Sequence, residues 1–233
     1  MSSPANTCLL DPVLTFLVRE FIDLLLPYIT RMVNASLRQG RLPDPQKHAV
    51  VSPLLKKSGL DASDMANFRP VSNLTFLSKV VETAVARQLN DYLAANDLLP
   101  RHQSAYRKRN STETTTLRVL SDALSAADGQ RVTLMGLLEL TAAFDCVDHT
   151  LLLKQLQLEF GFADTVLSWL TSFVTGRTQQ VAFDGHMSAT TSVEFGVLQG
   201  SVLGPLLFVL YTAQLSQVVA AHGLTLHQYA DDC

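Results

Sequence analysis

The tightest constraint on the fold comes from two short apolar segments, each of which ends in carboxylates. Residues 132–140 are almost wholly apolar and carry Glu139 near their end, and residues 224–229 lead into Asp231 and Asp232. Short apolar runs bounded by polar residues are typical of strands buried on both faces. Adjacent carboxylates raise one another's pKa, so their pairing is unfavourable unless a cation lies between them. We therefore predict two neighbouring strands that place Glu139 and Asp231 around one or two metal ions.

The residue types indicate which metal such a site would bind. Mg²⁺ takes oxygen ligands and commonly uses one or two carboxylates plus the phosphates of a substrate. Two such ions about 3.5–4 Å apart activate an attacking hydroxyl group and stabilise the leaving oxygen of a phosphoryl transfer. Each residue also has a simpler interpretation, because Asp-Asp pairs are common in solvated turns and a lone Glu139 would suit a surface position at a strand end.

A glycine-rich segment lies between the two carboxylate-bearing segments. Residues 195–208 place three glycines in a loop that runs into a helix, in the order Gln-Gly-Ser-x-x-Gly-Pro. Glycine allows a backbone to approach a ligand closely, and the N-terminus of a helix favours anions. An ordinary helix entry would also contain glycine, but this order of residues is unusually specific.

Helical and strand patterns alternate along the chain, which predicts an α+β fold. Apolar spacing predicts helices over residues 11–37, 74–95, 110–124, 149–159, 164–175 and 205–223. The first is expected to break at Pro27, and Asn110 followed by Glu113 is expected to cap the third. Strands are predicted over residues 48–55, 132–140, 179–183, 187–195 and 224–229. Asp184-Gly185 is the expected two-residue turn of a hairpin.

Charge is distributed unevenly along the chain. Residues 1–130 hold 15 basic and 12 acidic side chains, whereas residues 131–233 hold 3 basic and 9 acidic ones. A half that binds phosphates beside a half that binds metal would have this distribution. A chance asymmetry would have it as well, and charge alone favours chance.

Other features exclude several classes of protein. The apolar runs are far shorter than the roughly 20 residues that a membrane helix needs, and residues 1–6 lack the basic start of a secretory signal. The cysteines Cys8, Cys146 and Cys233 are widely spaced and form no CxxC pair, which argues against a zinc site or a disulfide framework. We expect an intracellular protein, cytoplasmic or nuclear, with no membrane partner, and its oligomeric state is open.

Five segments closely resemble the motifs of reverse transcriptases, above all those encoded by non-LTR (LINE-type) retrotransposons. The palm motifs are represented by Glu139–His149, Gly196–Pro205 and Tyr229–Asp232. The fingers motifs are represented by Asn67–Asn73 and Gln103–Glu113. The resemblance covers nearly the whole chain, and five motifs in the order of the family make coincidence very improbable.

The resemblance implies an α+β fold with the fingers and palm of a right-hand polymerase, the palm carrying a small antiparallel sheet backed by helices, with the thumb missing. Residues 1–130 would form an N-terminal extension and the fingers, and residues 131–233 an incomplete palm. The reverse transcriptase domain would span about residues 48–233. The implied partners are deoxynucleoside triphosphates (dNTPs) and an RNA or DNA template with its primer, and the implied cofactors are two Mg²⁺ or Mn²⁺ ions.

The family also implies a role for each candidate site residue. Asp231 and Asp232 would bind the catalytic metals together with the carboxylate of Glu139. Phe144 would be a steric gate beneath the sugar that excludes a 2′-hydroxyl group by size.

The remaining candidate residues would bind the incoming nucleotide. Arg107 would contact the triphosphate with help from Lys56 or Lys57, because charge-assisted arginine contacts suit phosphates. Gln199 and Gly200 would shape the pocket around the nascent base pair.

The chain departs from the family pattern at several points. The family has aspartate where this chain has Glu139, and the extra methylene moves the carboxylate by roughly 1.5 Å. A misplacement of about 1 Å at a reacting centre can cost around 100-fold in rate. The chain also ends one residue after Asp232, so we expect the second strand of the hairpin to be absent. Leu198 replaces a proline and Ala105 a glycine, and both are expected to matter less.

Three functions are therefore open. The first is an RNA-directed DNA polymerase domain that transfers nucleotides to a primer 3′-hydroxyl during retrotransposition. The second is a catalytically defective remnant that at most binds nucleic acid, which Glu139 and the missing strand favour. The third is an RNA-templated RNA polymerase, which Phe144 argues against because a large gate disfavours ribonucleotides.

Overall fold

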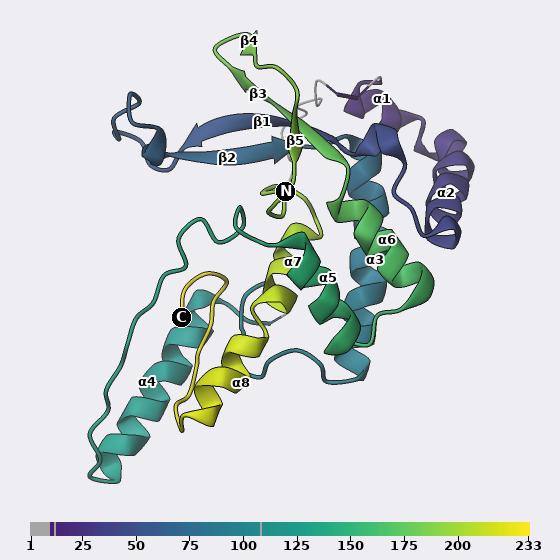
Figure 1. The fold of residues 1–233 in the computed structure, drawn as a ribbon. Coiled ribbons are helices and arrows are strands. Elements are labelled where there is room, and N and C mark those ends of the chain that lie inside the picture. The colour runs from purple at the N-terminus through teal and green to yellow at the C-terminus, as the bar shows by residue number, and fades with distance from the viewer. Residues whose placement is uncertain (1–9, 12, 108) are drawn as a thin grey trace.

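The computed structural model describes residues 10–233 apart from 12 and 108 (Figure 1). Cys8, Lys108 and the predicted absence of a secretory signal in residues 1–6 lie outside the described residues. The helices are α1 (Thr15–Glu20), α2 (Ile22–Gln39), α3 (Phe76–Ala95), α4 (Thr112–Asp128), α5 (His149–Leu158), α6 (Asp164–Val174), α7 (Gly204–Tyr211) and α8 (Gln214–Ala221). The strands are β1 (His48–Leu55), β2 (Phe68–Asn73), β3 (Arg177–Phe183), β4 (His186–Met187) and β5 (Thr191–Val193). The predicted α+β class is confirmed.

The five strands form one mixed sheet at the top of the molecule in Figure 1. Their order is β2-β1-β3-β4, and β5 pairs with β3 as well. β1 runs antiparallel to β2, with Val50 opposite Asn73, and parallel to β3, with His48 opposite Thr178. The parallel pair joins segments that are far apart in the sequence, with α3, α4, α5 and α6 between them along the chain.

The main core lies below the sheet, where α3, α5, α6 and α7 meet. Each of these helices contributes fully or almost fully buried aliphatic residues, such as Val81, Leu152, Leu170 and Leu207. Burying side chains of this size stabilises the fold by about 1.5–3 kcal/mol each relative to full exposure. The predicted apolar face of α3 is confirmed, although the same face also buries Glu82, which the sequence pattern did not single out.

The predicted hairpin turn is confirmed. Phe183 lies opposite His186, so Asp184 and Gly185 form a two-residue loop, and both have left-handed φ values of 48° and 75°. Positive φ at both central residues is the pattern that Asp-Gly favours in tight hairpins. The returning strand is interrupted, however, and continues as β4 and β5.

Two local predictions are wrong in detail. The first helical segment breaks at Phe21 rather than at Pro27, and α2 runs through the proline. Proline removes a single N–H donor there, in the exposed early part of a helix, where the freed carbonyl group can turn to solvent. The N-cap of α4 is Ser111 rather than Asn110, and it forms a capping box with Thr114.

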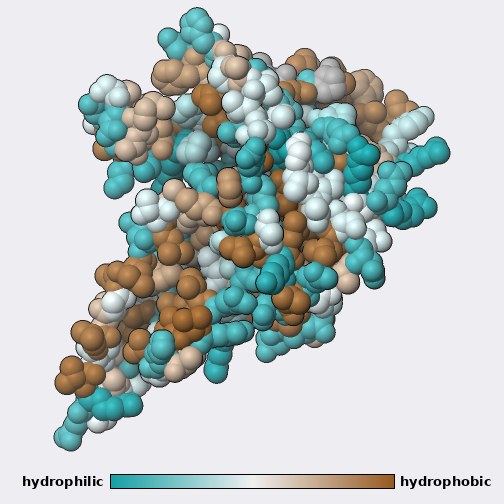
Figure 2. Space-filling model, viewed as in Figure 1, coloured by the Kyte–Doolittle hydropathy of each residue, from teal (hydrophilic) through white to brown (hydrophobic). Residues whose placement is uncertain are grey.

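The two predicted palm strands do not form as regular strands. Residues 131–138 are extended without sheet partners over most of their length, and Val132 and Leu134 are each 97% exposed. Residues 224–229 likewise form only isolated bridges at Gln228 and Tyr229. A strand needs a partner for its backbone groups as well as apolar side chains, and the described residues supply one only near the carboxylates. Figure 2 shows apolar side chains gathered on the lower left of the molecule, over this region.

One stretch of the described residues, Gly204–Ala221, is apolar and long enough to cross a membrane by length and composition alone. It is longer than the apolar runs noted in the sequence. The structure divides it into α7 and α8 at Thr212 and Ala213, and α7 is buried in the main core. A buried core helix has the same composition as a membrane helix of this length.

Candidate functional site

The carboxylate pair lies in a tight turn near the C-terminus. Tyr229 and Asp232 exchange both backbone hydrogen bonds, at 2.9 and 3.2 Å, so the turn closes over Ala230 and Asp231. Ala230 has a left-handed φ of 58° and is buried. A residue with a Cβ is strained in this conformation, so the turn depends on the segments packed on either side.

One side of the turn pairs with the end of the extended segment. Leu138 and Cys233 exchange two backbone hydrogen bonds of 2.9 and 2.8 Å, and Glu139 forms an antiparallel bridge with Asp232. Glu139 and Asp232 are therefore a non-hydrogen-bonded pair, whose Cβ atoms lie on the same face about 4.5–5.5 Å apart. This register brings Asp232, rather than Asp231, opposite Glu139.

The other side of the turn pairs with the loop before α4. The N–H of Ser104 donates to the carbonyl of Gln228 at 2.9 Å, and the N–H of Gln228 donates to the carbonyl of His102 at 3.0 Å. The loop thereby brings Tyr106 towards the turn. Partial burial raises the pKa of the Tyr106 phenol, and the charge of Asp231 raises it further.

The bridge and the turn thus bring the backbones of the three predicted metal ligands near one another. Among the described residues, no three His, Cys, Asp or Glu side chains are grouped so that they could hold a metal ion. Asp231 instead lies near Tyr106, which sequence reasoning did not single out. Its position inside the motif Gln103–Glu113 was the available signal, but nothing local indicated that this loop would meet the turn.

The glycine-rich loop is held against the segment that follows Glu139. The N–H of Gly196 donates to the carbonyl of Val147, and the N–H of Val197 to that of Phe144, both at 2.8 Å. The buried His149 ring contacts the Gly196 carbonyl oxygen through Nε2, also at 2.8 Å. Two segments that are separate in the sequence therefore form one backbone-bonded unit.

Phe144 is half-buried beside this loop. Its ring stacks on Phe208 of α7, with centroids 4.8 Å apart and planes at 17°. Such stacking contributes about 0.5–1.5 kcal/mol beyond burial. Partial burial also raises the pKa of the neighbouring Asp145 carboxyl. The position of Phe144 is therefore set by α7 as well as by its own loop.

Gln199 and Gly200 lie against the end of β2. The N–H of Ser72 donates to the carbonyl of Gln199 at 2.7 Å. Gly200 has a φ of 108°, and a Cβ at this position would lie 2.6 Å from the Ser72 carbonyl oxygen. Only glycine fits such an approach, so the predicted pocket loop is attached to the sheet as well as to the helical core.

The three predicted basic residues lie in two places. Lys56 and Lys57 are exposed just beyond the end of β1, at the tip of the β1–β2 hairpin (Figure 1). Arg107 is half-buried, and its guanidinium donates to the carbonyls of Pro100 and Gln103 at 2.9 and 3.2 Å. These bonds hold Arg107 on its own loop in this structure, whereas both lysines are free to reach solvent.

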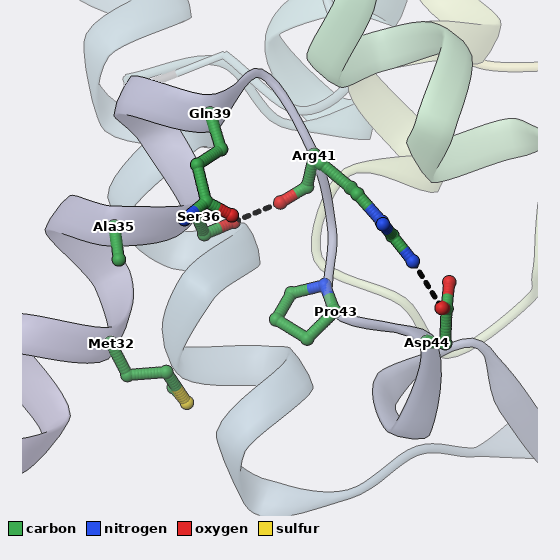
Figure 3. Close-up of a pocket in the computed structure, with 7 residues that line it drawn as sticks. All are labelled: Met32, Ala35, Ser36, Gln39, Arg41, Pro43 and Asp44. Atoms are coloured by element: carbon green, nitrogen blue, oxygen red, sulfur yellow. Dashed lines mark hydrogen bonds and ion pairs between the residues drawn. The ribbon is translucent and has the colours of Figure 1, made fainter.

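Two pockets among the described residues lie elsewhere. Figure 3 shows one of about 320 Å³ at the end of α2, where Ser36 donates to the Arg41 carbonyl at 2.6 Å and the Arg41 side chain pairs with Asp44. The other, of about 480 Å³, lies between α2, α3 and α6 with an apolar lining that includes Phe162 and Trp169. Neither pocket contains a predicted site residue.

Comparison with known sequences identifies close relatives over this region. Residues 54–233 match the family described as "Reverse transcriptase (RNA-dependent DNA polymerase)". The "Probable RNA-directed DNA polymerase from transposon X-element" of Drosophila melanogaster is 33% identical over 207 residues, which is 88% of this chain and 22% of that protein. The "RNA-directed DNA polymerase from mobile element jockey" of Drosophila funebris is 31% identical over 221 residues, 92% of this chain and 24% of that protein. The chain thus spans less than a quarter of the length of these relatives.

Comparison with solved structures identifies the same architecture. The structure of apo telomerase from Candida tropicalis, truncated from its C-terminal domain, superposes with a TM-score of 0.56 at 14% identity. The match covers 80% of this chain and 43% of that one. At this level of identity the likeness concerns the fold alone.

Proposed function

This chain belongs to the reverse transcriptase family, to the type encoded by non-LTR retrotransposons, and we propose that it forms the fingers and palm of an RNA-directed DNA polymerase. In this proposal it extends a primer along an RNA or DNA template with dNTPs. The observation that carries the proposal is the convergence of three separate segments. Glu139 pairs with Asp232, and Phe144 and Val147 bond to the glycine-rich loop.

The acidic residues would serve as the metal ligands of this reaction. Glu139 and Asp232 are exposed, face one way and offer only carboxylate oxygens, which is the donor type that Mg²⁺ and Mn²⁺ prefer. Asp231 is the neighbouring residue in the turn and would complete the set. Two bound ions would neutralise the charge that develops as a 3′-hydroxyl attacks the α-phosphate and pyrophosphate leaves.

The other residues would bind and orient the nucleotide. The half-buried Phe144 ring would lie beneath the sugar and leave no room for a 2′-hydroxyl group. Gln199 and Gly200 would line the nascent base pair, and the exposed Lys56 and Lys57 would attract the triphosphate or the template backbone. Catalysis of this kind consists mainly of positioning and charge stabilisation.

A second proposal, a defective remnant that at most binds nucleic acid, also has a specific observation in its favour. Asp232 lies opposite a glutamate instead of the aspartate of the family, and Asp231 lies near Tyr106. Like charges directly opposite each other on two strands are also destabilising. Both proposals agree on the family and differ only in whether these carboxylates reach a productive geometry.

Primer extension with Mg²⁺ or Mn²⁺ by the wild-type chain and its Glu139→Asp variant separates the two proposals. A polymerase whose ligand is displaced by a methylene group should extend a primer up to about 100-fold faster after the substitution. An Asp232→Asn variant in each background is the control and should abolish extension. Equal extension rates for the wild type and Glu139→Asp would refute the proposal that Glu139 impairs the polymerase. No extension by either chain would favour the proposal of a defective remnant.

A further inference from the structure

Glu82 is a fully buried carboxylate that the proposed reaction does not use. It lies on α3 with 0% of its surface exposed, among the aliphatic residues of the main core. Buried carboxylates are strongly disfavoured unless their oxygens accept hydrogen bonds. Burial accordingly raises the pKa of Glu82, while its hydrogen bonds and the charge of Arg177 act in the opposite direction.

The carboxylate bonds to the segment that connects the glycine-rich loop to α7. Oε2 accepts hydrogen bonds from the N–H groups of Val202 at 2.7 Å and Leu203 at 3.2 Å, and Oε1 accepts from the Ser78 hydroxyl at 3.0 Å. Leu203 is the N-cap of α7 and its side chain makes no capping bond. A negative charge at this end also interacts favourably with the helix dipole. The Ser201 hydroxyl accepts from the N–H of Gly204, the first residue of α7. Glu82, on a distant helix, supplies the acceptor for the two amides that precede it.

Both predicted parts of the nucleotide pocket are attached to this segment. Upstream of Val202, the loop carries Gln199 and Gly200 against β2. Downstream, α7 carries Phe208, on which the Phe144 ring stacks. A shift of the segment would therefore move the base-pair loop and the gate together.

A buried arginine accompanies the carboxylate. Arg177 is 3% exposed, its Nε donates to the Phe173 carbonyl, and its guanidinium carbon lies 4.3 Å from the centre of the Phe173 ring. Its two terminal nitrogens have no hydrogen-bond partner among the residues that the structure describes. Burial lowers the pKa of Arg177 to about 10, and the charge of Glu82 opposes this shift. The two charges thus attract each other through the core, and this attraction opposes the rise that burial causes in the pKa of Glu82.

We propose that Glu82 is a positioning residue of the nucleotide site, which holds the glycine-rich loop and α7 through the N–H groups of Val202 and Leu203. The inference rests on the proposed polymerase function for its effect on nucleotides, but the hydrogen bonds themselves are independent of it. Charge-assisted bonds of this kind are roughly twice as strong as neutral ones. Loss of the charge should therefore loosen the segment without unfolding the core.

The first test is amide hydrogen exchange of the complete chain in the Glu82→Gln and Glu82→Met variants. Glutamine keeps one oxygen acceptor in nearly the same volume, and methionine keeps no oxygen acceptor. We expect exchange at Val202 and Leu203 to accelerate about tenfold with Gln, and further with Met, because tenfold corresponds to the loss of one such interaction. Thr83→Val is the matched control, since Thr83 is the next residue on α3, is exposed and donates only to the Lys79 carbonyl.

The second test is single-nucleotide incorporation by the same variants, in wild-type and Glu139→Asp backgrounds. A displaced loop and gate should raise the KM for dNTP about tenfold with little change in kcat, and lower the discrimination between dNTP and rNTP. A purely structural contribution would reduce the amount of active protein but leave KM and discrimination unchanged.

The outcomes are distinguishable. Unchanged exchange at Val202 and Leu203 would overturn the inference, as would an equal acceleration over all core amides or an equal effect of Thr83→Val. If neither background incorporates nucleotides, the polymerase assignment fails, and exchange at the two amides alone decides whether Glu82 positions the loop. Faster exchange together with unchanged KM and discrimination would also count against a role in the nucleotide site.

Discussion

At the scale of single residues, Gly200 has the most restricted position in the candidate site. Its φ of 108° is one that residues with a Cβ rarely adopt, and the Ser72 carbonyl oxygen lies 2.6 Å from where a Cβ would be. Gly59 has a similar φ of 90°, but nothing lies within 4 Å of its Cβ position. Comparing substitutions at the two glycines therefore separates the cost of backbone strain from the cost of steric overlap.

Replacing Gly200 with alanine should destabilise the fold more than replacing Gly59. Both substitutions incur roughly 1–2 kcal/mol of backbone strain. Gly200→Ala should lose about 1–3 kcal/mol more, because the new methyl group must displace β2 or the loop. Urea unfolding of the two variants measures the difference, and equal losses would show that the loop does not rest on Ser72 as described.

At the scale of elements, α4 is a helix with little support from packing. Its apolar residues Leu117, Leu120 and Leu124 are all more than half exposed. Its first turn is instead held by side chains, since the Ser111 hydroxyl accepts from the Thr114 N–H and the Thr114 hydroxyl accepts from the Ser111 N–H. An exposed helix gains most of its stability from such caps and from tertiary contacts.

The capping box predicts the effect of a single substitution. Ser111→Ala should destabilise α4 by about 1 kcal/mol, and it should accelerate amide exchange throughout α4 while leaving α3 and α7 unchanged. Thr116→Ala is the control, because the Thr116 hydroxyl donates only to the Thr112 carbonyl within the helix. If the control accelerates exchange as much as Ser111→Ala, the cap is not what holds the first turn.

At the scale of the whole molecule, the basic hairpin tip and the acidic turn belong to different parts of the fold. Lys56 and Lys57 directly follow β1 of the sheet, whereas Glu139 pairs with Asp232 at the turn near the C-terminus, which lies below the sheet in Figure 1. Such an arrangement suits a nucleic acid, because its phosphate backbone could contact the basic residues while its reactive end contacts the metal-binding residues.

Neutralising the hairpin tip should weaken nucleic-acid binding in a salt-dependent way. For a single strand, each lost phosphate contact lowers the slope of log K against log salt by about 0.7, so Lys56→Ala with Lys57→Ala should lower it by about 1.4. Lys79→Ala with Lys154→Ala is a control of equal charge, on exposed positions of α3 and α5. Fluorescence anisotropy measures both slopes, and equal decreases would mean that the tip makes no particular contact.

Local patterns were sufficient for most helices and for the hairpin. The helical spacing of α3, the first turn of α7 with Pro205, and the Asp184-Gly185 turn are set by residues within a few positions of one another. The short sequence motifs also predicted the family correctly, since residues 54–233 match the reverse transcriptase family. Such features were predictable because the interactions that determine them join residues that are close together in the sequence.

The tertiary structure alone decided how these parts meet. It places Asp232 rather than Asp231 opposite Glu139, brings Tyr106 to the turn, and buries Glu82 beneath the start of α7. It also leaves residues 131–138 exposed although their composition is that of a core strand. Strand register and burial depend on residues that are far away in the sequence. A pattern of apolar side chains shows which residues would be stable when buried, but it does not show which segment of the fold will cover them.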